Sequence, residues 1–390
     1  MSFIYLDYAA TTPLSKTVKN KLIDYINNDD SYFFNSGSST YEKAKNISDQ
    51  IELARADIAK TLGVLNREII FTSGATESNN LAIKGIVQAY QDKGKHIITS
   101  KAEHKAVLDV CKYLETQGCK VTYLEVDSRG RVDTLDLEKA ITEQTILVSL
   151  MAVNNELGTM NDLIKIGEIT KRNMVFFHVD AAQGYGKVNL DIKAMNIDLL
   201  SVSGHKIYSP KGVGFLYVRS RVPRVKLVKQ IHGGTQEFGI RAGTLPNYQI
   251  FALAEACKDI FTHKEENYRH IIKLRDMFLE QLSKIENIKI NTDLQNSYPG
   301  ILNVTIKGVK AETLLAMLDE VCLSMGSACN SKAIEPSHVL RAIGLNTEEA
   351  DSTIRVSFGL PTTEKEVIKA VSFIKEKVRI LRMLSPFSTF

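Results

Sequence analysis

The sequence has no long apolar run. No stretch of its 390 residues approaches the roughly 18 consecutive apolar residues of a membrane-spanning helix, so we expect no membrane span. The opening stretch MSFIYLDYAATT carries Asp7 and lacks a basic region followed by an apolar one, so we expect no signal peptide. Internal repeats and low-complexity linkers are also absent. These absences favour an ordinary globular protein.

Cysteine is scarce and irregularly spaced. The five cysteines are Cys111, Cys119, Cys257, Cys322 and Cys329. Their number is odd and none form a Cys-x-x-Cys pair, so the sequence suggests neither a disulfide framework nor a zinc site. We therefore expect no metal and a cytoplasmic location, where thiols stay reduced.

Charge of one sign is not in large excess either. The net charge is +4 and the pI about 8.6, too mild to require nucleic acid as a direct partner. Apolar residues make up 44% and charged residues 24%, as in ordinary globular domains. A chain of this length usually exceeds one hydrophobic core, so we expect two domains.

Short apolar runs alternate with helical patterns from about residue 42 to 220. The first helical stripe is Ile47, Ile51, Ala54, Ile58 and Leu62. The predicted strands are EIIFT, HIITS, KVTYLEV, TILVSLMAV, MVFFHVD, IDLLSVS and VGFLYV. Because most of them are separated by segments of helical length, we expect an α/β domain with a largely parallel sheet.

The pattern changes after Pro246 to a long helical region reaching about Lys284. An α+β mixture follows and ends in an amphipathic helix whose apolar stripe is Val367, Val371, Ile374, Val378 and Leu381. We therefore predict a large domain over residues 15–260 and a small domain formed by residues 1–14 and 261–390.

Polar residues gather just after the predicted strands, where ligands of open α/β sheets bind. After EIIFT, the segment SGATESNN places Thr76 and Glu77 at a helix start, which suits a phosphate but also an ordinary helix cap. Polar residues also lie at or just after the ends of four further predicted strands. They are His104 after HIITS; Asn154, Asn155 and Glu156 after TILVSLMAV; Asp180 and Gln183 at and after the end of MVFFHVD; and Ser203, His205 and Lys206 at and after the end of IDLLSVS. Each residue alone has an ordinary structural explanation.

Lys206 indicates which ligand this set of polar residues could bind. A lysine at a strand end beside small polar residues suits a Schiff base, and the buried carboxylate of Asp180 suits a pyridinium nitrogen. A phosphate site, an aromatic ring, an amide, a carboxylate and a lysine at five strand ends are the set that pyridoxal 5′-phosphate needs. We therefore expect this cofactor.

Motifs over nearly the whole chain resemble the NifS/IscS-type cysteine desulfurases, which are fold-type I enzymes dependent on pyridoxal phosphate in the class-V aminotransferase family. The motifs are YLDYAATTP, FTSGATESNN, EHKAVL, VNNELG, HVDAAQ, SVSGHKIYSPKGVG, RAGTLPN, GSACNS, EPSHVLRAIGL and IRVSFG. The resemblance implies a large domain with a mostly parallel seven-stranded sheet, a smaller α+β domain and a homodimer.

The resemblance also implies roles for particular residues. Lys206 forms the Schiff base, Asp180 pairs with the ring nitrogen, and His104 stacks on the ring and shuttles protons. Gln183 reaches the ring hydroxyl, and Asn155 lies near this hydroxyl and the substrate carboxylate. Arg355 binds the substrate carboxylate. The residues implied in phosphate binding are Ala75, Thr76, Ser203 and His205, with Thr244 contributed across the dimer interface.

Cys329 lies in SMGSACNSK, among residues with very small side chains. In the activity that the resemblance implies, a thiolate takes the sulfur of L-cysteine, which leaves L-alanine and an enzyme persulfide. A cysteine on a loop of small residues can visit both the pocket and an acceptor, so we assign this role to Cys329. Cys111, Cys257 and Cys322 are expected to be structural.

Some features of the sequence depart from the family's pattern. Ser36 and Tyr41 in FNSGSSTY stand where the family has proline and histidine, and Phe238 in GGTQEFG stands where it has arginine. The chain ends at LRMLSPFSTF, where relatives serving an iron–sulfur scaffold often continue, so a tRNA thiolation enzyme is an equal expectation as sulfur acceptor. A selenocysteine lyase or an aminotransferase-like enzyme is the alternative activity. A non-catalytic adaptor is disfavoured because the set of predicted catalytic residues is present.

Overall fold

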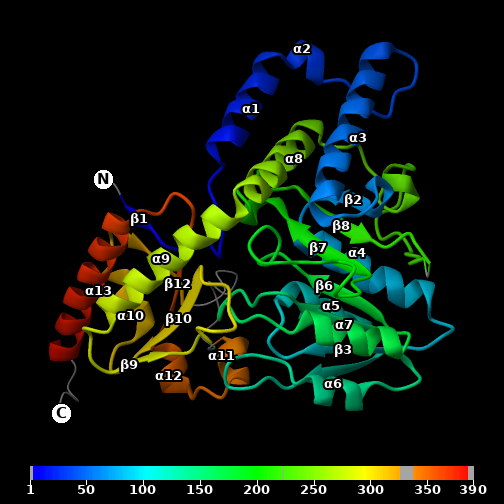
Figure 1. Cartoon of the computed structure of the whole chain (residues 1–390). Helices are drawn as coiled ribbons and strands as arrows, with labels where there is room; N and C mark the ends of the chain where they lie inside the picture. The colour runs from blue at the N-terminus through cyan, green and yellow to red at the C-terminus, as the bar shows by residue number, and fades with distance from the viewer. Residues whose placement is uncertain (1–2, 223, 326–336, 385–390) are drawn as a thin grey trace.

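The computed structural model describes residues 3–222, 224–325 and 337–384. A seven-stranded sheet with helices on both faces occupies one side, and smaller sheets lie beside it (Figure 1). The strands of the large sheet are β2 (Ile69–Thr72), β3 (His96–Ser100), β4 (Lys120–Leu124), β5 (Thr145–Met151), β6 (Phe176–Asp180), β7 (Leu199–Ser203) and β8 (Gly214–Val218). Each corresponds to one predicted run, so the prediction of these seven strands is confirmed.

The sheet has the strand order β2-β8-β7-β6-β5-β3-β4, and only β8 runs antiparallel to its neighbours. Every residue of β3, β5, β7 and β8 is buried, because helices cover both faces. The helices of this part are α1 (Lys16–Asn27), α2 (Asp29–Tyr32), α3 (Glu42–Leu62), α4 (Ala75–Ala89), α5 (Lys105–Thr116), α6 (Thr134–Ala140), α7 (Leu163–Arg172) and α8 (Asn247–Thr262). The prediction of a mostly parallel α/β sheet is confirmed.

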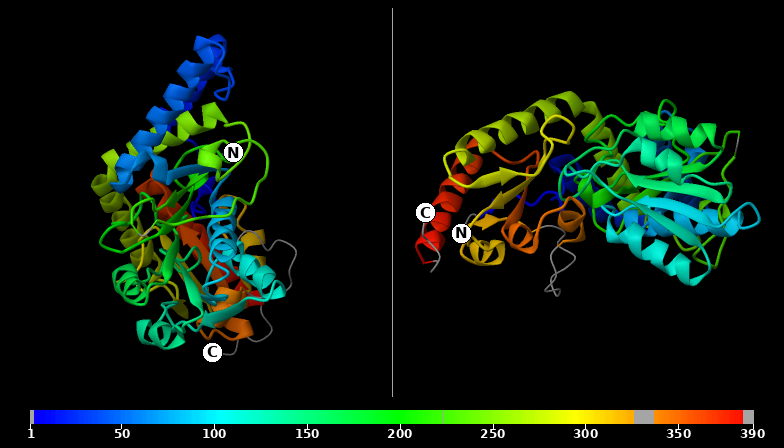
Figure 2. Two further views of the ribbon diagram at one scale, coloured as in Figure 1. Left: turned by 90° about the vertical axis from the view of Figure 1, so that its right-hand side faces the viewer. Right: turned by 90° about the horizontal axis from the view of Figure 1, so that it is seen from below.

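Two apolar clusters cover the two faces of the sheet. Alternate strand residues pack against α4 and α5 on one face and against α3, α7 and α8 on the other. The predicted stripe of α3 is buried along its whole length, whereas α1, α2 and the start of α3 project beyond the body (Figures 1 and 2).

The smaller part contains a three-stranded antiparallel sheet and a two-stranded parallel one. Their strands are β9 (Ile288–Ile290), β10 (Ile301–Ile306), β12 (Thr353–Ser357), β1 (Ile4–Tyr5) and β11 (Val321–Cys322). Its helices are α9 (Lys264–Leu282), α10 (Ala311–Ala316), α11 (His338–Ala342), α12 (Thr347–Asp351) and α13 (Glu364–Leu384). Short 3-10 turns are η1 (Asn66–Glu68), η2 (Gly204–Lys206) and η3 (Glu237–Gly239). The predicted stripe of α13 faces inward, with Leu381 only partly buried.

The long helical region predicted after Pro246 is two helices. Helix α8 ends at Thr262 and α9 begins at Lys264, because His263 takes the non-helical angles φ −108° and ψ 18°. α8 lies along the large sheet, while α9 continues to the small sheet and packs on α13 (Figure 2, right). The two-domain division at residues 260 and 261 stays a prediction, which this change of course supports.

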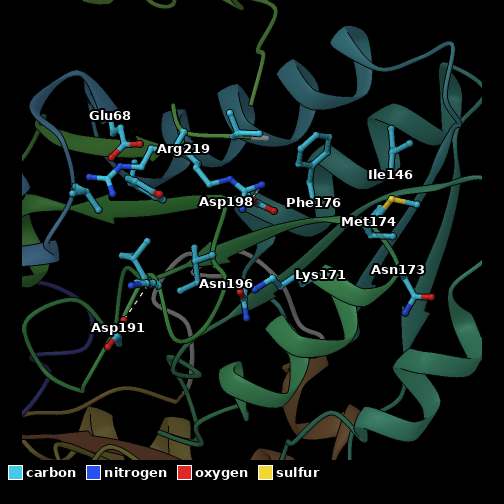
Figure 3. Close-up of a pocket in the computed structure, with 18 of the residues that line it drawn as sticks. Glu68, Ile146, Lys171, Asn173, Met174, Phe176, Asp191, Asn196, Asp198 and Arg219 are labelled. Atoms are coloured by element: carbon cyan, nitrogen blue, oxygen red, sulfur yellow. Dashed lines mark hydrogen bonds and ion pairs between the residues drawn. The ribbon is translucent and has the colours of Figure 1, made fainter. Parts of the chain in front are cut away.

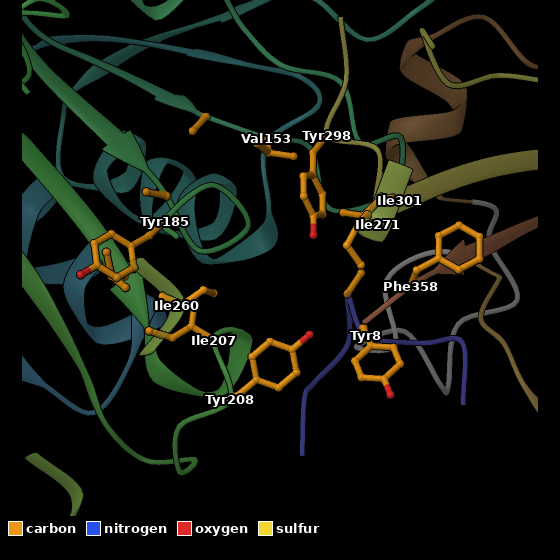
Figure 4. Packing of buried hydrophobic residues seen from close by; sticks show 14 of the residues in the cluster. Tyr8, Val153, Tyr185, Ile207, Tyr208, Ile260, Ile271, Tyr298, Ile301 and Phe358 are labelled. Atoms are coloured by element: carbon orange, nitrogen blue, oxygen red, sulfur yellow. The ribbon is translucent and has the colours of Figure 1, made fainter. Parts of the chain in front are cut away.

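One apolar core joins the two parts. Tyr8, Tyr208, Tyr298 and Phe358 belong to the same buried cluster as Tyr185 beneath the large sheet (Figure 4). The rings of Tyr8 and Tyr208 are 6.5 Å apart, so the N-terminal segment is seated between the parts. In the described ranges, no helix combines the length and apolar character needed to cross a membrane.

Candidate active site

A cavity of about 430 Å³ lies at the carboxyl edge of the large sheet, where β12 of the small sheet faces it. This volume is in the usual range for small-molecule sites. Residues that line it are Ala9, Ala10, Ser73, Gly74, Ala75, Thr76, Glu77, Asn79, His104, Ala106, Met151, Val153, Asn155, Asp180, Ala182, Gln183, Ser203, His205, Lys206, Lys211, Gly212 and Arg355. The structure therefore brings together every predicted site residue except Thr244 and Cys329. Cys329 lies outside the described residues.

One end of the cavity is built to accept an anion. Gly74 precedes α4 with φ 145° and offers no side chain to cap the helix, so the first backbone N–H groups of α4 face the cavity end. A Cβ on Gly74 would stand 3.2 Å from Ser203 Oγ, which shows how closely this backbone approaches the serine. His205 lies beside it with Nδ1 3.1 Å from Thr11 Oγ1. Burial and the neighbouring lysines lower the pKa of His205 to about 4.

Asp180 occupies the floor of the cavity at the end of β6. Its Oδ2 accepts a hydrogen bond from Asn79 Nδ2 at 2.7 Å, and its Oδ1 accepts one from the backbone of Ala182 at 2.9 Å. Asn79 was missed as a site residue, although it follows Ala75 by four residues and therefore lies on the same face of α4. These two hydrogen bonds fix the direction of the carboxylate.

Lys206 is in η2, directly after β7. Its Nζ donates to the backbone oxygens of Ala9 and Ala10 at 2.6 and 2.7 Å. The N-terminal segment thus aims the amine into the cavity. Lys206 is the lysine predicted for this pocket, but Lys211 lines it as well, because the chain turns back through Gly212 into β8.

His104 caps α5 rather than lying free on the surface. Its Nδ1 accepts a hydrogen bond from the backbone N–H of Ala106 at 3.1 Å, so the proton of the neutral ring is on Nε2. Burial lowers the pKa of His104, as does Lys206, although Asp180 opposes this shift. At neutral pH the imidazole is therefore suited to exchange protons without carrying a permanent charge.

Arg355 enters the cavity from β12 and is 1% exposed. Its Nη2 donates to Asp7 Oδ1 at 2.7 Å and its Nη1 to the backbone oxygen of Asn155 at 3.0 Å. Nε has no hydrogen-bond partner in the described part of the chain. The guanidinium is thus held in place by two of its five N–H donors, and the Nε–H is among those left for a carboxylate.

Several buried polar atoms around the cavity lack a partner within the described residues. They are Asn79 Oδ1, Asn155 Oδ1 and Arg355 Nε, together with Glu103 Oε2 and Glu156 Oε1 just behind the wall. Such atoms are costly to bury unpaired, so they mark a place where a polar ligand completes the structure. A phosphate cradle, a carboxylate, an amide and an amine fit pyridoxal phosphate. No cluster of His, Cys, Asp or Glu in the same ranges is arranged to hold a metal ion.

Glu103 is fully buried beside His104. Its Oε1 accepts from the backbone of Met151 at 2.9 Å and from Ser100 Oγ at 3.1 Å. Burial, helped by Asp180, raises the pKa of Glu103 from 4.5 to about 8. This carboxyl group is therefore protonated at neutral pH.

We predict that Glu103→Gln flattens the pH dependence of stability. Between pH 4.5 and about 8 the folded state holds a proton on Glu103 that the unfolded chain releases, so the stability that this group contributes is lost as the pH rises. Relative to the wild type, the variant should gain on the order of a few kcal/mol in free energy of unfolding across this window. Urea unfolding at several pH values measures this gain. The exposed control Glu125→Gln should keep the wild-type slope, and parallel curves for Glu103→Gln would refute the prediction.

Thr244 is exposed and lies outside the cavity of its own chain. The segment before it is fixed by Glu237, whose carboxylate forms two 2.8 Å bonds to buried Arg55 and accepts from the backbone of Phe71. Arg55 also lies between the rings of Phe71 and Phe238, at 4.6 and 5.0 Å. Phe238, the departure from the family's arginine, thus packs on this ion pair.

The Arg55–Glu237 pair also holds a strained turn, because Glu237 and Phe238 both have positive φ angles. We predict that Glu237→Gln lowers the free energy of unfolding by about 3 kcal/mol, since it removes the buried one of the two carboxylates that pair with the guanidinium. Glu52 also bonds Arg55, but its side chain is 51% exposed, so the control Glu52→Gln should cost less than about 1 kcal/mol. Equal losses in urea denaturation would contradict the difference in burial.

A wider hollow of about 1560 Å³ lies at the opposite, amino edge of the sheet (Figure 3). Its buried carboxylate, Asp198, pairs with Arg219 and accepts from the backbone of Phe177. Glu68 accepts from the backbones of Leu65 and Ser220. Because these groups already serve the local structure, the smaller cavity at the carboxyl edge is the candidate active site.

Comparisons with known proteins point the same way. The family model described as aminotransferase class-V matches residues 4–369. "Cysteine desulfurase IscS" of Neisseria meningitidis serogroup C (strain 053442) is 49% identical over 383 residues, 98% of this chain and 94% of the relative. The protein of that name from Colwellia psychrerythraea is 47% identical with the same coverage.

Solved structures give the same result. One titled "NIFS-LIKE PROTEIN" has a TM-score of 0.89 and 35% identity over 98% of this chain and 100% of its own. One titled "SspA in complex with cysteine" has a TM-score of 0.81 and 39% identity over 91% of this chain and 98% of its own. The second holds cysteine.

Proposed function

Because the chain belongs to the aminotransferase class-V family, we propose that it is a cysteine desulfurase dependent on pyridoxal phosphate, which converts L-cysteine to L-alanine and an enzyme persulfide. The expected resemblance, fold and cofactor are confirmed by the family match and the relatives. The observation on which the function chiefly rests is the cavity that gathers Lys206, Asp180, His104 and Arg355 at one sheet edge.

In this proposal the two ends of the cavity hold the two ends of the cofactor. The N-terminus of α4, with Ala75 and Thr76, and the side chains of Ser203 and His205 bind the phosphate. Asp180, fixed by Asn79, keeps a negative charge at the ring nitrogen. When bound, pyridoxal phosphate supplies an electron-withdrawing ring that lowers the cost of removing a proton from the α-carbon of an amino acid.

The protein's own groups then act on the substrate. Arg355 Nε and the amide of Asn155 bind its carboxylate, and Asp7 keeps the guanidinium in place. Lys206 and His104 are the groups positioned to move protons: the amine lies among backbone acceptors, and the imidazole presents Nε2. These roles stay proposals for each residue.

Cys329 is proposed as the sulfur acceptor. Its thiolate attacks the substrate sulfur, the Cβ–S bond breaks, and the carbon product takes up a proton to become alanine. Residues on both sides of it in the chain are attached near the cavity: Ser324 pairs with the backbone of Arg355, which lines the cavity, and Ser337 Oγ donates to Glu156 Oε2, behind the cavity wall, at 2.6 Å. Cys329 is five positions after Ser324 in the chain, a reach of up to about 17 Å.

The experiment that tests the function is a product assay. Purified protein given L-cysteine and a reductant should release L-alanine and sulfide in equal amounts. L-Selenocysteine serves as the second substrate, because a strong preference for it would replace the proposal by a selenocysteine lyase. Transfer of the amino group to a keto acid without sulfide would instead indicate an aminotransferase.

We propose further that the active form is a homodimer in which Thr244 contacts the phosphate bound by the partner subunit. Its exposure and the fixed segment before it support this proposal. The mass of one chain is 43.5 kDa, and sedimentation should give twice this value. Thr244→Val should weaken cofactor binding by about tenfold, the effect of losing a hydrogen bond to a charged group. A fully active monomer would contradict both statements.

The acceptor of the persulfide is proposed to be a protein, either an iron–sulfur scaffold or a tRNA thiolation enzyme, in the cytoplasm. The four described cysteines are free thiols, which supports a reducing compartment. Arg382, a basic residue near the end of α13, donates hydrogen bonds to the backbone oxygens of Lys307 and Glu286. It therefore stabilises the fold and is not assigned to the binding of an acceptor.

A further inference from the structure

Lys187 lies directly behind the cavity wall, in the turn that follows β6. Its Nζ donates to Gln183 Oε1 at 2.8 Å. Gln183 Nε2 donates in turn to the backbone oxygen of Ala9 at 2.7 Å, and this same oxygen accepts from Lys206. Lys187 is therefore linked to the predicted cofactor lysine through a single amide and a single carbonyl.

These two partners decide which way the amide of Gln183 points. A lysine ammonium has donors and no acceptor, whereas a carbonyl oxygen has acceptors and no donor. Rotating the amide by half a turn would place NH₂ against the ammonium and oxygen against the Ala9 oxygen, so both attractions would become repulsions. Oxygen toward Lys187 and nitrogen toward Ala9 is the only arrangement that satisfies both.

The orientation of the Gln183 amide leaves the second hydrogen of Nε2 for a group in the cavity. Gln183 is 4% exposed and lines the cavity, and its NH₂ group has two N–H bonds, of which Ala9 takes one. The other N–H remains for an acceptor within the site. An electron-rich oxygen is the ligand group that matches it.

The surroundings of Lys187 keep its amine next to Gln183. Its Nζ lies 5.6 Å from the centre of the buried Tyr298 ring, which approaches from the smaller part of the molecule. Burial and the charge of Lys206 lower the pKa of Lys187 to about 7. Whether protonated or neutral, the amine keeps at least two N–H donors, so its bond to Gln183 persists.

We propose that Lys187 is a positioning residue that fixes the amide of Gln183 with an N–H directed at the ring oxygen of the cofactor. The proposal rests on the proposed function, because it needs pyridoxal phosphate in the cavity. Lys187 touches neither cofactor nor substrate, and its whole effect passes through Gln183.

The test is a double-mutant cycle read as the dissociation constant of pyridoxal phosphate, measured by titrating cofactor-free protein. Lys187→Met keeps the stem and removes the donor, and it should weaken binding about fivefold, as expected for one lost hydrogen bond. In the Gln183→Ala background the same change should have no further effect. Lys187→Arg, which again offers only donors, should restore binding to within about twofold of the wild type.

Two outcomes would overturn the proposal: no effect of Lys187→Met, or an equal effect with and without Gln183, which would indicate direct action through charge. Gln183→Glu tests the orientation even where Lys187→Met does not fold, because it keeps an oxygen toward Lys187 and puts a second oxygen in place of the N–H. It should bind the cofactor no better than Gln183→Ala, and tighter binding would also overturn the proposal. Wild-type protein that binds no cofactor would refute the proposed function instead.

Discussion

Replacing Lys206 with alanine is expected to abolish the covalent attachment of the cofactor and to lower alanine formation by about 10³-fold or more. The amine is the one that the cavity holds by two short bonds, to Ala9 and Ala10, at the end of β7. Without it the cofactor aldehyde has no linked amine, and a proton carrier is lost as well. The measurement is borohydride reduction followed by peptide mass spectrometry, together with the alanine assay.

Lys211 provides the matched control, because it also lines the cavity but is exposed. Lys211→Ala should leave the attachment on Lys206 intact. Reduced cofactor recovered on Lys211 or Lys187 of the wild-type protein would show that the assignment of Lys206 is wrong. Circular dichroism of each variant separates this result from a loss of fold.

The second large effect is expected for Cys329→Ser. Cofactor binding and recognition of L-cysteine need no enzyme thiol, so both should stay within about twofold of the wild type, as for other changes away from bound groups. Persulfide formation and alanine release should fall below detection, because a hydroxyl is a far poorer acceptor of sulfur. At the reference pKa of about 8.5 only a few per cent of a thiol is ionised at neutral pH, so we expect the pocket to assist its ionisation.

Cys322→Ser is the control for this variant. Cys322 lies on β11 beside the N-terminal strand, and burial, with the charge of Asp7, raises its pKa, which disfavours a nucleophilic role. The variant should lose some stability and keep turnover. Mass spectrometry after one exposure to L-cysteine should find one added sulfur atom in Cys322→Ser and none in Cys329→Ser. The reverse pattern would identify Cys322 as the acceptor.

The sequence alone was sufficient for the strands and for the order of the polar residues at their ends. A continuous apolar run such as TILVSLMAV is typical of a strand that is buried on both faces of a parallel sheet. The carboxyl ends of parallel strands lie at the same edge of the sheet. Asp180, Lys206 and His104 were therefore predictable as neighbours before any coordinates. The break at His263 was not, because both sides of it have the same helical periodicity.

Only the tertiary structure revealed what holds these residues in place. Asn79 on Asp180, Ala9 on Lys206, Asp7 on Arg355 and Lys187 on Gln183 are contacts between side chains or backbone atoms whose directions depend on packing. Most of these contacts join segments that are far apart in the chain. The periodicity of apolar residues along the sequence carries no information about contacts between such segments. Local patterns determine which face of an element is buried, whereas the partners of a buried polar group are decided when the layers close and each donor must find an acceptor.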